Sequence, residues 1–157
     1  MAEYDVGQIN SQLEKVEHCT VSSFTLDGLR INSRHMSFAS GSSLVAFYLM
    51  TNKTTYKLNE IQKNPAVTLS ILGNKGSFEG YFQATVFGKI AILDQFADPA
   101  VQTALERLGA KSGLARMLKG SGSLGDYVIL RLSTEEIHYS VMANIMKGVP
   151  QTILKFQ

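Results

Sequence analysis

The sequence predicts a mainly β (α+β) fold: an antiparallel split β-barrel with Greek-key elements and short flanking helices. Six or more β-like segments follow one another, most of them separated by short turns rich in glycine, serine or asparagine. Helical patterns are confined to the start of the chain and to two places between strands. Consecutive antiparallel strands flanked by a few helices are typical of a closed or nearly closed barrel.

The first third of the chain predicts a helix followed by a hairpin. Apolar residues recur at helical spacing over residues 5–17, which favours an amphipathic helix. Residues 18–26 are rich in β-formers, Asp27-Gly28 is a strong turn signal, and residues 29–38 return as a second strand. A turn at residues 40–43 then leads into a third strand.

The third strand, residues 44–50, is apolar at every position, so the side chains on both of its faces should be buried. A helix over residues 56–63 follows and is ended by Asn64-Pro65. Residues 66–72 predict a fourth strand and residues 73–76 a turn. Residues 78–93 form the longest β-like stretch, in which Gly80 and Gly88 are expected sites of a bulge or bend.

The remainder of the chain predicts a helical insertion and two or three further strands. Asp98-Pro99 is a typical helix start, with a helix to Leu108 and a second over residues 111–118. Residues 127–133 and 137–142 predict two strands, and residues 149–156 a last one. The 157 residues are interpreted as one domain, with an N-terminal helix (1–17), a helical insertion (94–119) and a C-terminal tail (143–157).

The doubly apolar third strand needs a cover on its outer face. A second copy of the chain is the simplest cover, which predicts a twofold homodimer. The alternative is that the N-terminal helix covers this face.

Composition limits the possible partners. The formal net charge of +2 provides no strong basic field, so nucleic acid is not expected as the main partner. No apolar run approaches the ~20 residues of a membrane-spanning helix, and no signal peptide is recognisable. The single Cys19 excludes an internal disulfide, and a cytoplasmic location is expected.

The residues between the third strand and its following helix predict an anion pocket. Thr51 and Thr55 could offer hydroxyl groups, the helix start carries partial positive charge, and Lys57 adds a full one. Arg34, on the preceding strand, could supply a second charge. Simpler roles stay open: the threonines could only cap the helix, Lys57 could be solvated, and Arg34 could pair with Asp27 or Glu60.

Four segments together resemble the pyridoxamine 5′-phosphate oxidase-like FMN-binding split-barrel family, especially its general-stress-protein branch. The resemblance spans about residues 16–138. The segments are Asp27-Gly28 with Ser33-Arg34-His35-Met36, then Tyr48-Leu49-Met50-Thr51-Asn52, then Lys57 with Asn64-Pro65-Ala66-Val67, and finally Gln83-Ala84-Thr85-Val86-Phe87-Gly88.

This resemblance implies a flavoprotein that binds FMN at the interface of two subunits, and a flavin-dependent oxidoreductase acting on a small substrate. Three groups of residues would contact the cofactor. They are Arg34, His35, Met36 and Ser37 on the second strand, Met50, Thr51, Thr55, Tyr56 and Lys57 after the third, and Gln83 on the long strand.

Departures from the family pattern argue against oxidation of pyridoxamine phosphate itself. Tyr56 stands where the true oxidases have an arginine before the lysine, and a chain without tryptophan lacks their C-terminal substrate region. A flavin-binding, redox-sensing or stress-response protein without turnover is therefore an alternative. A deazaflavin (F420) or haem is the alternative ligand, and haem is disfavoured because no histidine is clearly placed to bind iron. The catalytic residues are not identified.

Two further motifs carry no chemistry. The segment of residues 120–125 matches a dinucleotide-binding fingerprint, but it follows a helix and precedes a strand, the reverse of the order that the mechanism requires. It is interpreted as a loop that could close over the flavin. The three histidines show no metal-ligand spacing.

Overall fold

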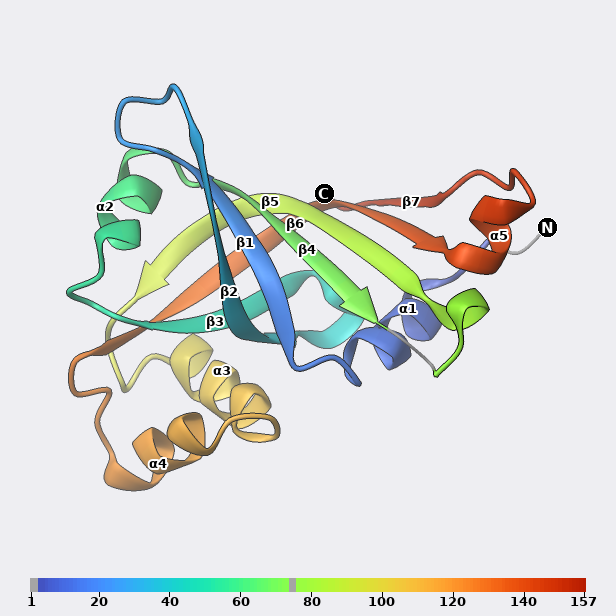
Figure 1. Cartoon of the computed structure of the whole chain (residues 1–157). Helices are drawn as coiled ribbons and strands as arrows, with labels where there is room; N and C mark the ends of the chain where they lie inside the picture. Colours follow the sequence, from blue (N-terminus) through green and yellow to red (C-terminus); the bar gives the residue numbers. More distant parts are fainter. Residues whose placement is uncertain (1–2, 74–75) are drawn as a thin grey trace.

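A computed structural model describes residues 3–73 and 76–157, which form a closed six-stranded antiparallel β-barrel with short flanking helices (Figure 1). The strand order is β3-β2-β1-β4-β5-β6, and pairing of β3 with β6 closes the barrel. Strands β1 to β3 follow one another and β4 returns beside β1, which is a Greek key. The predicted fold class is therefore confirmed. The barrel strands are β1 (His18–Phe24), β2 (Ile31–Ser40), β3 (Ala46–Asn52), β4 (Ala66–Gly73), β5 (Phe82–Leu93) and β6 (Tyr127–Val141).

Helices α1 and α3 each begin next to an aspartate whose side chain caps them. Asp5 and Gln8 form a reciprocal capping box at the start of α1, and Asp98 with Pro99 opens α3. Helix α1 ends at Leu13, earlier than predicted. The helices are α1 (Val6–Leu13), α2 (Tyr56–Lys63), α3 (Pro99–Gly109), α4 (Gly113–Ser121) and α5 (Met142–Met146), with 3-10 turns η1 (Ser42–Leu44) and η2 (Phe78–Gly80).

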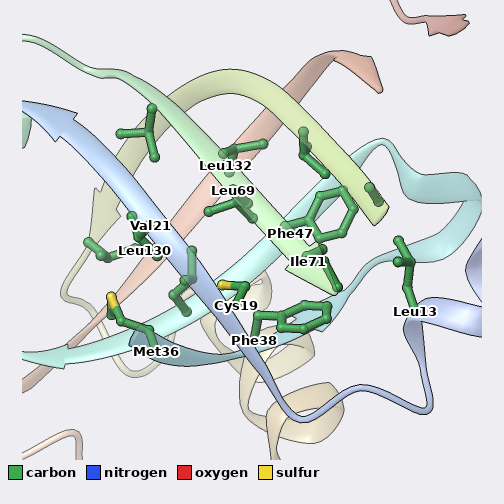
Figure 2. Packing of buried hydrophobic residues seen from close by; sticks show 14 of the residues in the cluster. Leu13, Cys19, Val21, Met36, Phe38, Phe47, Leu69, Ile71, Leu130 and Leu132 are labelled. Atoms are coloured by element: carbon green, nitrogen blue, oxygen red, sulfur yellow. The ribbon is translucent and has the colours of Figure 1, made fainter. Parts of the chain in front are cut away.

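Two helices lie toward opposite ends of the barrel and bury apolar side chains in its core. Helix α1 contributes Ile9 and Leu13, and α2 contributes Leu58 and Ile61. Between them the inward-facing side chains of the strands fill the barrel (Figure 2). Helix α2 contacts β2 through Glu60, which bonds Asn32 and Arg34, and through Lys57, which lies beside Met36.

The outer face of β3 is covered by the helical insertion. Phe47 and Leu49 face the barrel core, whereas Ala46 and Tyr48 belong to a second cluster with α3 and α4. The cover of this strand is thus part of the same chain. It is not α1, as the alternative interpretation had it, and the apolarity of β3 no longer argues for a second copy.

The longest strand pair, β5 with β6, contains a bulge beside Gly88, as the sequence predicted. The register of β5 against β6 shifts between Phe87 and Gly88, so Glu135 has no partner across the pair. The predicted strands 127–133 and 137–142 are one continuous strand, β6, that passes through this bulge.

The remaining differences lie at the chain's connections. Helix α5 was not predicted, and the last strand, β7 (Thr152–Lys155), is shorter than residues 149–156 and pairs with β6. The predicted turn at residues 73–76 includes two residues, 74 and 75, that lie outside the described part of the chain. No helix within residues 3–73 and 76–157 is long and apolar enough to cross a membrane.

Candidate functional site

The connection from β3 to α2 places two threonine hydroxyls at the start of the helix. Thr51 is 5% exposed at the end of β3, and its hydroxyl oxygen is 3.4 Å from that of Thr55. Thr55 occupies the N-cap position of α2, yet its side chain does not cap the helix and instead donates to the backbone oxygen of Asn52 at 2.9 Å. The capping role that the sequence allowed for Thr55 is therefore not used.

Lys57 is a half-buried ammonium group without an acidic partner. Its Nζ lies 3.8 Å from Sδ of Met36, and within the described residues no carboxylate forms an ion pair with it. Burial lowers the pKa of Lys57, and repulsion from the nearby guanidinium of Arg34 lowers it further. Two positive groups from β2 and α2 are thus close enough to interact.

Arg34 is partly neutralised by a buried carboxylate. Its Nη2 donates to Oε1 of Glu60 at 2.9 Å, and its Nη1 donates to the hydroxyl of Ser23 at 3.2 Å. Glu60 is 1% exposed, and its other oxygen accepts from Nδ2 of Asn32 at 2.6 Å. Of the two acidic partners considered for Arg34 from the sequence, the structure therefore selects Glu60. Asp27 lies instead beside Arg30 in the hairpin turn.

Five of the ten predicted site residues gather at the α2 end of the barrel. They come from β2, from the end of β3 and from the start of α2, and they combine two cations, two hydroxyl groups and a thioether. They are Arg34, Met36, Thr51, Thr55 and Lys57.

The other five predicted residues do not join this group: four lie on other parts of the chain, and Tyr56 begins α2 but is mostly exposed. His35 is exposed, with Nδ1 3.2 Å from the Thr20 hydroxyl, and Ser37 has the same strand parity, away from the core. Gln83 is exposed on β5, three strands from β2. Met50 packs against the cluster that contains α3 and α4. Tyr56 is 63% exposed and lines a pocket of about 380 Å³ between the β1–β2 hairpin and α2.

Sequence reasoning did not include three polar residues of this region among the site residues. Asn32 precedes Arg34 by two positions on β2, so the alternation of Asn32, Arg34 and Met36 on one face was a signal available in the sequence. Ser23 lies on the adjacent strand and pairs with Asn32 in register. Glu60 lies next to the core residue Ile61 on α2, a position at which an acidic side chain requires a partner.

The chemistry of the gathered residues suits an anion rather than proton transfer. An ammonium group, one edge of a guanidinium and threonine hydroxyls are donors that bind phosphate oxygens. Proton transfer would need a free carboxylate or histidine among these residues. Both oxygens of Glu60 already accept hydrogen bonds, and the Glu136–His138 pair lies on a different element, β6. The described residues contain no group of three or more side chains that could hold a metal ion.

The glycine-rich segment after α4 is held at both ends. Gly122 ends α4 in a left-handed conformation, and Leu124 is buried in the second cluster. The backbone N–H of Lys53 donates to the carbonyl of Asp126 at 2.8 Å, so this segment runs beside the end of β3. Its predicted role as a closing loop stays a prediction.

Comparison with known proteins identifies a family and a set of similar folds. A family model described as pyridoxamine 5′-phosphate oxidase matches residues 6–140. No protein of curated function gives a significant match.

Many solved structures have similar folds at low sequence identity, and three of them are as follows. A protein related to general stress protein 26 of Bacillus subtilis, from Clostridium acetobutylicum, has a TM-score of 0.70 and 19% identity, covering 96% of this chain and 94% of that one. A haem-binding protein from Mycobacterium smegmatis has a TM-score of 0.73 and 9% identity, and the match covers 99% of this chain and 60% of that one. The haem storage protein HutZ from Vibrio cholerae has a TM-score of 0.66 and 13% identity, and the match covers 88% of this chain and 95% of that one.

Proposed function

This chain belongs to the pyridoxamine 5′-phosphate oxidase family, and from that premise we propose that it is an FMN-binding flavoprotein. We propose further that it is a flavin-dependent oxidoreductase of a small substrate, working in the cytoplasm, where the lone thiol of Cys19 stays reduced. The bound flavin would supply the electron transfer, and the protein would bind and orient it.

The observation that carries this proposal is the unpaired charge of Lys57. Half-burial and the nearby Arg34 both disfavour its ammonium form, and no carboxylate compensates it within the described residues. A bound phosphate would remove this penalty, because an anion stabilises both cations together. Thr51 and Thr55 would add hydroxyl donors, and Met36 would offer an apolar contact beside the phosphate.

The remaining family positions support a site shared between two subunits. Gln83, His35 and Ser37 lie on the opposite side of the sheet from Lys57, so one subunit does not bring all of them to one ligand. We therefore propose a homodimer with FMN at the interface, in which the partner subunit supplies part of the flavin contacts. The molar mass in solution, measured by light scattering, tests this: a monomer at micromolar concentration would refute it.

The decisive experiment compares FMN with riboflavin, which lacks the phosphate. Titration with each flavin, followed by quenching of flavin fluorescence, should show much tighter binding of FMN. Lys57→Gln should weaken FMN binding by about 1.5–3 kcal/mol, the contribution of a charge-assisted hydrogen bond, and should leave riboflavin binding nearly unchanged. Lys63→Gln is the matched control, because Lys63 is an exposed lysine in the last turn of the same helix.

Two results would contradict the proposal. If the wild-type protein binds neither flavin, it is not a flavoprotein. If Lys57→Gln and Lys63→Gln bind FMN equally well, Lys57 is solvated and the phosphate lies elsewhere.

A flavin-binding protein without turnover is the second candidate. It is favoured by the lack of a free carboxylate or histidine beside Lys57 among the described residues. Reduction of bound FMN by NADH or NADPH and its reoxidation by a small acceptor, at rates above those of free flavin, would exclude this candidate.

Two other ligands are tested by the same preparation. A deazaflavin (F420) and haem each have an absorption spectrum distinct from that of FMN. Titration of the purified protein with all three therefore identifies the preferred ligand directly.

A further inference from the structure

The most fully bonded buried charge in the described residues is the carboxylate of Glu60. Its side chain is completely buried, and each oxygen accepts one hydrogen bond, from Arg34 and from Asn32. A buried charge is retained at a cost unless it is paired and hydrogen-bonded, and this one meets both conditions. From the sequence, Glu60 was considered only as a possible ion-pair partner of Arg34.

The contacts of Glu60 fix the guanidinium of Arg34 in one orientation. Glu60 holds Nη2, and Ser23 holds Nη1 at 3.2 Å, so two sides of the planar group are anchored to α2 and β1. A guanidinium has five N–H donors, and anchoring two of them leaves the others directed away from these partners. Lys57, which lies three residues before Glu60 on the same helix, experiences the field of this guanidinium.

We infer that Glu60 is a positioning residue, which holds Arg34 so that its free donors and the ammonium of Lys57 meet one phosphate group of the ligand. This inference rests on the proposed function, since it concerns the same site. Glu60 touches no ligand and acts only through Arg34. It also reduces the fixed charge of the trio Arg34, Lys57 and Glu60 to a single positive charge.

The test uses the ratio of riboflavin Kd to FMN Kd, which isolates recognition of the phosphate. In Glu60→Leu the freed guanidinium should lower this ratio by about tenfold or more, because charge-assisted bonds to phosphate are lost. Glu60→Gln keeps one acceptor for Arg34 and should retain part of the ratio. Riboflavin binding should change little in either variant, which a general loss of structure would not produce. Glu106→Leu, at an exposed glutamate of α3, is the matched control and should leave the ratio unchanged.

A double variant keeps the test decisive if a single variant folds poorly. Arg34→Met with Glu60→Leu removes both charges, and replacing a buried ion pair by apolar residues is often neutral for stability. If Glu60 acts only through Arg34, the double variant and Arg34→Met alone should have the same ratio. A wild-type ratio in Glu60→Leu, or a clear difference between the double variant and Arg34→Met, would overturn the inference.

The two proposals fail in different ways. A wild-type protein that does not distinguish FMN from riboflavin refutes the phosphate site, and the role of Glu60 with it. A wild-type protein that does distinguish them, with a ratio unaffected by Glu60→Leu, refutes only the role of Glu60.

Discussion

Substitution of Gly88 by alanine should destabilise the barrel at its bulge. A Cβ atom at this position would lie 2.2 Å from the backbone oxygen of Ser133 and 2.6 Å from Cδ2 of Leu132. Ordinary van der Waals contact begins at 3.4 Å, so the shortfall against the carbonyl is 3.4 − 2.2 = 1.2 Å. Ser133 pairs in register with Lys89 and Ala46, and Leu132 is in the core, so neither neighbour can withdraw easily.

The expected magnitude follows from two opposing effects. Overpacking against fixed atoms costs about 1–3 kcal/mol, and a backbone neighbour favours the upper end. Alanine also restricts the unfolded chain and returns about 0.4–1 kcal/mol. The net loss should be about 2 kcal/mol, which for a chain of this length lowers Tm by roughly 4–8 °C.

Urea denaturation monitored by circular dichroism measures this loss directly. Gly120→Ala is the matched control, because Gly120 lies in α4 with no atom within 4 Å of its added Cβ. It should stabilise the protein by about 0.5–1 kcal/mol through helix propensity. A Gly88→Ala protein as stable as the wild type, with an unchanged m value, would refute the steric argument.

Two further predictions concern the cover of β3 and the buried thiol. Leu105→Ala should cost about 2–5 kcal/mol in urea denaturation, because Leu105 of α3 is completely buried in the cluster that α3 and α4 form with the barrel. Met117→Ala, at an exposed site of α4, should cost less than about 0.5 kcal/mol. Equal effects would mean that the helical pair does not cover the barrel. Burial raises the pKa of Cys19 to about 12, so a thiol reagent at pH 8 should modify the native protein far more slowly than the urea-unfolded one, and equal rates would show that Cys19 is accessible.

Local signals in the sequence predicted most of the elements of this fold. Asp98-Pro99 marked the start of α3, Asn64-Pro65 marked the end of α2, and the glycine of the long strand marked the bulge. These features depend on dihedral preferences and hydrogen bonds within a few residues, which any stretch of sequence carries with it.

The candidate site was predictable in part. The sequence assigned Lys57 and Arg34 to one anion pocket, because Arg34 lies on the strand before the third strand and Lys57 lies in the helix after it. In the structure the two groups are close enough for the charge of Arg34 to lower the pKa of Lys57. The other predicted site residues were not brought to this group. Met50 points to the outer face of β3, opposite to its neighbour Thr51, and Gln83 lies three strands from β2.

The sequence by itself determined most of the strands, the turns between them, the start of α2 and of α3, and the residues that carry charge at the candidate site. Only the tertiary structure decided which surfaces meet: that α3 and α4 cover β3, and that Glu60 lies against Arg34. The physical reason is that burial and ion pairing depend on contacts between segments distant in the chain, and the pattern of one segment does not specify which other segment packs against it.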